Sequence, residues 1–205
     1  MRHIAFAIVM LSALPAHAHH PMGGAAPETL FQGLLGGLAH PVIGTDHLAM
    51  IVLVGLAAAS AGRLLAGPFM FIAATMMGTM VHLAGVTLPL AEAVILASVI
   101  AVGALLVMGR SLGGTLALAG FAVAGLFHGW AYGAAVIGAE PMPIASYLAG
   151  FGLIQLAIAL GTARVAMLLA SRPNGFVHAR IAAAVCLGVG LAVAAETLEA
   201  VLLAA

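Results

Sequence analysis

Charged residues, and lysine above all, are scarce in this 205-residue sequence. Only 6% of the residues are charged, against about 25% in soluble globular domains, and the mean hydropathy is +1.25. No lysine is present, and the six basic residues are balanced by six acidic ones, so the sequence has no polybasic patch for nucleic acid. A phosphate-binding loop of the Walker type needs a lysine and is therefore absent too. The composition excludes a soluble domain, makes a nucleic-acid partner unexpected, and predicts an integral protein in contact with membrane lipid.

Cysteine is almost absent as well. Cys186 is the single cysteine and lies in an apolar run, which excludes an intramolecular disulfide and a cysteine-rich metal site. We predict that Cys186 is a small core residue.

The amino terminus has the pattern of a secretory signal peptide. Arg2 and His3 form a short basic start, residues 4–14 are apolar, and Ala16-His17-Ala18 matches a cleavage site. We therefore predict a cleavable signal peptide over residues 1–18 and a mature transmembrane domain over residues 19–205 that starts on the outer side. The alternative is an uncleaved helix, although the apolar run is shorter than a full membrane span.

The rest of the chain consists of apolar segments separated by short breaks that contain Gly, Pro or Arg. Since about 20 apolar residues cross one bilayer, we predict an all-α, polytopic membrane helix bundle of about six transmembrane helices. The predicted spans cover residues 30–61, 68–87, 90–109, 112–137, 144–170 and 178–203. The first is too long for one straight crossing, so we expect it to be broken near Pro41 and Gly44. Broken backbone at membrane depth is tolerated only against protein or a wet cavity.

Arginine positions favour one orientation of these spans. With an outer amino terminus, the breaks after the first, third and fifth spans lie inside, and they contain Arg63, Arg110, and Arg172 with Arg180. Basic loops usually stay on the cytoplasmic side. We therefore expect a bacterial inner-membrane protein whose mature amino and carboxyl termini both lie in the periplasm.

Two groups of glycines are expected to form faces on which helices pack closely, because small residues let backbones approach in lipid. They are Gly33, Gly36 and Gly37 before the break, and Gly120, Gly125 and Gly129 in the fourth span.

The segment with the densest group of ionisable side chains is His40-Pro41-Val42-Ile43-Gly44-Thr45-Asp46-His47, which has two imidazoles and a carboxylate. Ionisable side chains inside membrane segments usually face the bundle interior or a watery cavity, and they mark paths for ions, protons or substrates. Imidazole ligands favour zinc, copper, iron and nickel over magnesium and calcium. We therefore expect His40, Asp46 and His47 to hold a transition-metal ion. A second role for Asp46, as a helix cap or dipole partner, is compatible with the first.

Two more histidines lie within predicted spans. His82 is late in the second span and His128 is in the second half of the fourth, so both map to the outer half, as His40 and His47 do. A lone histidine in a membrane often only bonds to a neighbouring helix, which is the alternative for His82. The common depth instead predicts one shared metal site.

Cleavage after Ala18 would give a mature chain that begins His19-His20-Pro21-Met22. Its α-amine and imidazoles form a nitrogen-rich set of the kind that suits Ni²⁺ or Cu²⁺. His19 and His20 are therefore candidates for an outer metal-capture site, the alternative being incidental histidines in a terminus.

These motifs resemble those of the HupE/UreJ family of nickel permeases, which are associated with hydrogenase and urease maturation. The resemblance rests on His-x5-Asp-His at 40–47, Phe-His-Gly-x-Ala at 127–131, a signal peptide and about six spans, and it covers nearly the whole mature chain.

The resemblance implies uptake of Ni²⁺, or of Co²⁺, as a transported substrate across the inner membrane. It implies neither an enzyme activity nor a prosthetic group. The partners that it implies are nickel-delivery or maturation proteins. The metal-handling residues carried over are His40, Asp46, His47 and His128.

After His128 the sequence departs from the family pattern. A further histidine or acidic residue is common there, whereas this chain has Tyr132, Ala134 and Ala135. Glu140 of the next loop is the candidate replacement.

Two other classes of function remain open. A membrane-embedded hydrolase would use zinc held by His and Asp to activate water, but it needs a further acid or base, and few carboxylates other than Asp46 lie at that depth. A non-transporting assembly partner or metal sensor would need a site but no polar route inward. The inner half is indeed poor in polar groups apart from Thr, Ser, Gln155 and the arginines.

Overall fold

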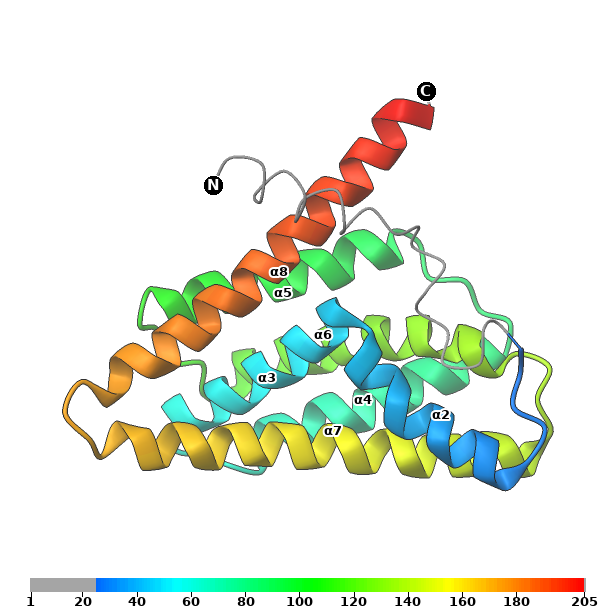
Figure 1. Cartoon of the computed structure of the whole chain (residues 1–205), viewed down its shortest axis with the longest axis horizontal. Coiled ribbons are helices and arrows are strands. Elements are labelled where there is room, and N and C mark those ends of the chain that lie inside the picture. Colours follow the sequence, from blue (N-terminus) through cyan, green and yellow to red (C-terminus); the bar gives the residue numbers. More distant parts are fainter. Residues whose placement is uncertain (1–24, 205) are drawn as a thin grey trace, which may run out of the picture.

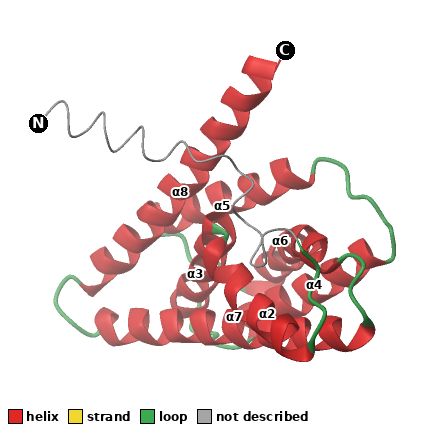
Figure 2. Cartoon of the chain, turned by 45° about the vertical axis from the view of Figure 1, so that its right-hand side comes forward, coloured by secondary structure: helices red, strands yellow, loops and turns green. Residues whose placement is uncertain are grey.

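The computed structural model describes residues 25–204, and this part of the chain folds into seven α-helices (Figure 1). In chain order they are α2 (Leu30–Ile43), α3 (Thr45–Ser60), α4 (Ala66–Leu83), α5 (Ala91–Val107), α6 (Gly114–Gly133), α7 (Pro141–Ala170) and α8 (Gly175–Ala204). A short 3-10 turn, η2 (Ala134–Val136), follows α6. Figure 2 shows helices and loops only in the described part, so the all-α prediction is confirmed there. The predicted signal peptide and His19 and His20 lie outside the described residues.

Four helices, α4, α6, α7 and α8, are long and apolar enough to cross a membrane. The pair α2 and α3 passes the same test as one broken span, bent by 79°. The protein is therefore a multi-pass helical membrane protein with four to five candidate spans in residues 25–204. The third expected span, residues 90–109, corresponds to α5, which is apolar but has only 17 residues. Its length of about 26 Å is less than the hydrocarbon thickness of about 30 Å, so the expected six spans exceed the candidates by one.

The bend between α2 and α3 has a local cause. α2 begins with a capping box, in which Thr29 and Gln32 bond to each other's backbone N–H through their side chains. Pro41 lies inside its last turn and has no N–H to continue the helical hydrogen bonds. Gly44 then adopts an extended conformation, with φ −71° and ψ 103°, between the two helices. The predicted break near Pro41 and Gly44 is confirmed.

The helices pack in two extensive pairs, α4 with α6 and α2 with α7, whose members run in the same direction, and α3 lies among them (Figure 1). α3 also contacts α5 and α8, and ten of its 16 residues are buried. A helix that is apolar on all sides is buried in this way. The predicted core residue Cys186 is buried against this centre, with 7% of its surface exposed.

Glycine sets the distance between the paired helices. A Cβ at Gly129 in α6 would overlap the carbonyl oxygen of Thr75 in α4. A Cβ at Gly37 in α2 would likewise overlap the carbonyl oxygen of Tyr147 in α7. Both positions were expected to form packing faces, and the structure confirms them. Gly120 was expected to do the same, but no atom lies within 4 Å of a Cβ built there, so that expectation is wrong.

Charges separate to the two ends of the bundle. Arg110 and Arg180 line one cavity where α5 and α7 end and α8 begins, and Arg63 lines a neighbouring one at the start of α6. Arg180 also donates from Nε to the carbonyl oxygen of Val107, at 2.7 Å. We call this the arginine end. Glu92, at the start of α5, and Glu196, late in α8, together line a cavity at the opposite end, which we call the acidic end.

Replacing Gly129 by Ala should lower the melting temperature of the purified protein in detergent. The added methyl group must push α4 and α6 apart, and such overpacking costs about 1–3 kcal/mol. Gly120→Ala is the matched control on the same helix, where the methyl group meets open space and helix propensity favours Ala. Equal melting temperatures for the two variants would contradict the close contact between α4 and α6.

Candidate metal site

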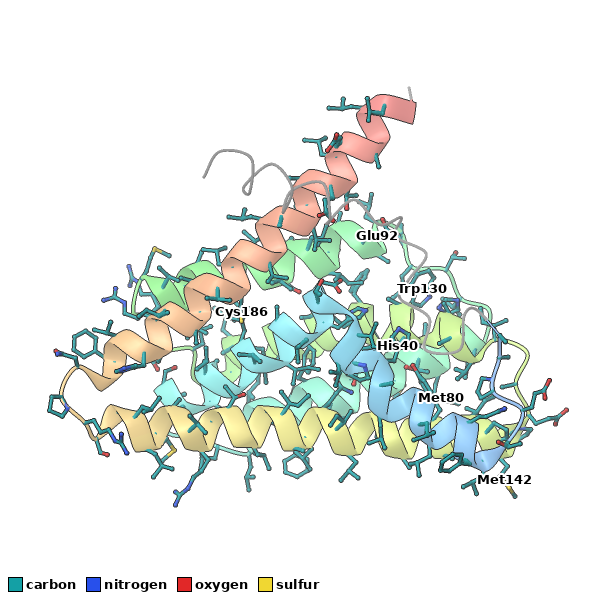
Figure 3. All side chains as sticks on the ribbon, viewed as in Figure 1. His40, Met80, Glu92, Trp130, Met142 and Cys186 are labelled. Carbon is teal, nitrogen blue, oxygen red and sulfur yellow. The ribbon has the colours of Figure 1, made fainter. Side chains whose placement is uncertain are left out.

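The bend between α2 and α3 faces a cavity of about 510 Å³. His40, Asp46 and His47 line it from the bend, and Glu92 and Glu196 line it from α5 and α8. Because both glutamates are exposed, the cavity reaches the surface at the acidic end. Figure 3 shows His40 toward the middle of the bundle and Glu92 near the start of α5 above it. The broken backbone therefore lies against a cavity, as expected.

Gly44 lets the His47 ring lie over the bend. A Cβ at position 44 would come within 2.8 Å of Cδ2 of His47, closer than real contacts allow. Asp46 precedes His47 in the first turn of α3, where the helix dipole favours a carboxylate. Its Oδ2 lies 3.9 Å from Nδ1 of His47. The bend therefore presents an imidazole and a carboxylate side by side.

His47 meets His128 of α6 in the buried centre of the protein. The Nδ1 atoms of the two rings are 2.8 Å apart, and the ring centroids are 5.0 Å apart. His128 is fully buried, and His47 is 8% exposed. Residues 81 positions apart in the chain thus bring two imidazole nitrogens into direct contact.

Ser98 of α5 determines which nitrogen of His128 carries the proton. The Ser98 hydroxyl donates to the carbonyl oxygen of Ile95 at 2.6 Å, so its oxygen accepts from Nε2 of His128 at 3.0 Å. His128 is therefore protonated on Nε2, and its Nδ1 presents a lone pair to His47. In the 2.8 Å contact, Nδ1 of His47 donates and Nδ1 of His128 accepts.

His40 joins this group through two tyrosines. Its Nδ1 is 2.7 Å from the hydroxyl of Tyr147 in α7. The ring of Tyr132 lies 4.9 Å from that of His40 and 4.2 Å from that of His47, measured between centroids. The two histidine rings are themselves 6.3 Å apart. Tyr132 thus packs against both histidines of the first motif.

His82 is placed elsewhere. Its ring stacks on Trp130 at 4.2 Å, and its Nδ1 is 2.5 Å from the carbonyl oxygen of Trp130. It lines a separate cavity with Val86 and Ile137. These contacts join the end of α4 to α6, which is the bonding role that was the alternative for His82.

The structure therefore brings His47 and His128 together, places Asp46 beside His47, and sets the His40 ring 6.3 Å from that of His47. Within residues 25–204, no three His, Cys, Asp or Glu side chains are arranged closely enough to hold one metal ion. The shared metal site expected from the sequence stays a prediction, and what the structure shows is a histidine pair with a nearby carboxylate. Glu140 is exposed before α7 and does not line this cavity.

Three polar residues of this site went unrecognised in the sequence. Tyr147 and Ser98 were not singled out, and Tyr132 was noted only as a departure from the family pattern. A weak signal existed for Ser98, which after Glu92 is the one polar residue in the apolar helix α5. Tyr132 and Tyr147 are the two tyrosines of the chain, and both are almost fully buried. A buried tyrosine hydroxyl usually needs a partner, which marks such residues for attention.

Comparison with known proteins agrees with these motifs. Residues 7–193 match the family described as HupE / UreJ protein. The chain belongs to the HupE/UreJ family. This is a family of transporters, associated with hydrogenase and urease accessory nickel uptake, and not one of enzymes.

One relative is Protein HupE of Rhizobium leguminosarum bv. viciae, which is 31% identical over 123 residues. The aligned part covers 59% of this chain and 62% of the relative, so this HupE/UreJ protein spans less than two thirds of that relative. No solved structure matches the chain.

Replacing Ser98 by Ala should weaken binding of nickel to the purified protein by about 10–100-fold, the usual effect of losing a group that orients a ligand. The change frees the His128 ring to turn or to move its proton. Ser98→Thr keeps the hydroxyl and should restore most of the affinity. Calorimetric titration with nickel chloride measures both, and equal affinities for the Ala variant and the unchanged protein would refute this role.

Proposed function

We propose that this HupE/UreJ protein carries a divalent transition-metal cation, Ni²⁺ first and Co²⁺ second, across the bacterial inner membrane for hydrogenase or urease maturation. His47 and His128 would bind the ion directly, with Asp46 and His40 beside them. The family association supports nickel, and the histidine pair supports the position of the site.

The observation that carries this proposal is the 2.8 Å separation of the two Nδ1 atoms. Imidazole nitrogen is a ligand of nickel, zinc, copper and iron, so two such nitrogens in contact, with the Asp46 carboxylate nearby, form a donor set for a divalent transition metal. A metal ion that replaced the proton between the two rings would be held by both Nδ1 atoms. The preference for nickel comes from the family association.

Charge supports a direction of movement. By the positive-inside rule, the arginine end would face the cytoplasm and the acidic end the periplasm. Glu92 and Glu196 would then attract cations to the mouth of the cavity, and Asp46 would offset the charge of an ion at the histidines. An inside-negative potential favours entry of a divalent cation by about 4.6 kcal/mol for each 100 mV.

The alternatives draw on the same residues. A zinc hydrolase usually holds its metal with three protein ligands and keeps one position open for water. Such a group of His, Cys, Asp or Glu does not occur within residues 25–204 for either metal, so the family association is what favours transport over hydrolysis. A non-transporting assembly partner would bind metal at the same pair, and uptake measurements separate it from a permease.

Replacing His47 or His128 by Ala should abolish most uptake of radioactive nickel by cells that express the protein. Each change removes one of the two nitrogens that would hold the ion. Asp46→Ala and His40→Ala should reduce uptake too, and His178→Ala, which removes an exposed histidine at the start of α8, is the control. At equal membrane levels, normal uptake in both the His47 and His128 variants would sink the proposal. Strong metal binding without any uptake by the unchanged protein would favour the assembly partner.

Competition between metals tests the imidazole ligands. Unlabelled Co²⁺ should lower uptake of radioactive nickel more strongly than an equal excess of Mg²⁺, because imidazole favours transition metals over magnesium. Equal competition by Mg²⁺ would contradict histidine ligands, even if nickel is transported.

A further inference from the structure

The cavity at the arginine end is separate from the candidate metal site. Its volume of about 440 Å³ lies within the range of about 300–1,000 Å³ that is usual for small-molecule sites. Residues from the ends of α3, α5 and α7 and from the start of α8 line it. These ends lie toward the left of Figure 1. The cavity has no residue in common with the one that contains His40, Asp46 and His47.

Most of the cavity wall is apolar and part of it is open to the outside. Leu56, Leu106 and Ala166 form a buried part of the wall. Met167 and Phe176 are exposed and lie on α7 and α8, which are both candidate membrane spans. The hydrocarbon chains of membrane lipid can therefore reach this wall.

Two arginines give the cavity a positive charge. Arg110 follows the end of α5 and Arg180 lies in the second turn of α8, and no acidic residue of the described part of the chain lines the cavity with them. Within residues 25–204 neither arginine is paired with a carboxylate. An anion in this cavity would therefore meet two cations without competition from a carboxylate.

The guanidinium group of Arg180 is held at the end of α5. Its Nε donates to the carbonyl oxygen of Val107, the last residue of that helix, at 2.7 Å. A Cβ built at Gly109 would lie 3.5 Å from Nη2 of Arg180, so the group lies beside the residue that precedes Arg110. The bond to Val107 uses one of five N–H donors. The terminal N–H groups of arginine form a fork that fits the oxygens of a phosphate.

We propose that this cavity binds one anionic phospholipid, whose phosphate is held by Arg110 and Arg180 and whose acyl chains lie against Met167 and Phe176. Basic pockets between membrane helices bind the head groups of anionic lipids. A free phosphate ion shares the charge of the head group but leaves the apolar wall uncovered, which favours the lipid. The inference does not depend on the transport function.

The other role for these arginines is to orient the protein in the membrane, since basic residues favour the cytoplasmic side. For that role the position of each arginine within the cavity is unimportant. Arg172 provides the matched control, because it is exposed between α7 and α8 at the same end but does not line the cavity. Arg110 is the residue to change, because Arg180 also bonds to the backbone of α5.

Native mass spectrometry of the purified full chain in a non-ionic detergent, titrated with phosphatidylglycerol, tests the site. Arg110→Gln should weaken the apparent affinity about tenfold, the usual effect of losing a hydrogen bond to a charged group. Arg110→Lys keeps the charge and should lose less, and Arg172→Gln should leave the affinity unchanged. Phosphatidylcholine should bind more weakly, because its choline group offsets the charge of the phosphate.

Two further measurements separate a lipid from a free anion. Phe176→Ala removes part of the apolar wall and should weaken binding of phosphatidylglycerol, and inorganic phosphate should not displace this lipid. Displacement by inorganic phosphate would overturn the proposal in favour of an anion site.

Equal losses in Arg110→Gln and Arg172→Gln would also overturn it, since the charge of the arginine end as a whole would then attract the lipid. So would an unchanged affinity in Arg110→Gln.

Discussion

The contact between Nδ1 of His47 and Nδ1 of His128 constrains most of what surrounds it. It joins α3 to α6 at 2.8 Å in a part of the protein that is almost fully buried. For the two nitrogens to bond, one ring must present a lone pair, and the bonds from Nε2 of His128 through Ser98 to Ile95 give that role to His128. His47 must also begin a helix and not continue one, which the bend at Gly44 provides. The cost of burying these polar groups is met by a chain of hydrogen bonds that strengthen one another in an apolar setting.

Close packing of the helices fixes the distances between them and so holds the two histidines in contact. Gly129 follows His128 in α6 and lies directly against the backbone of Thr75. The contact that fixes the position of α6 relative to α4 is therefore made by the residue next to His128. Gly37 does the same for α2 against α7, three residues before His40. In lipid, van der Waals packing of small residues supplies much of the attraction between helices. The glycines that looked like packing residues therefore also place the histidines.

The sequence predicted the architecture better than the site. Composition and the length of apolar runs predicted a helical membrane protein, and Pro41 with Gly44 predicted the bend, because these depend on local chemistry. The span count was less secure, since α5 has 17 residues and lies at the edge of what crosses a bilayer.

Depth alone grouped His82 with the other histidines, but it does not give the rotation of a helix about its axis. That rotation turns His82 toward Trp130 and His128 toward His47. The partners Ser98 and Tyr147 come from distant parts of the chain, where spacing in sequence carries no information about contact.

X-ray absorption at the nickel edge, on the purified full-length protein loaded with nickel chloride, tests most directly whether the histidine pair binds the metal. We expect a spectrum with imidazole nitrogens bound to nickel, and a clear loss of that imidazole signal in His128→Ala. A coordination shell made of oxygen alone, or a spectrum unchanged by His128→Ala, would contradict it.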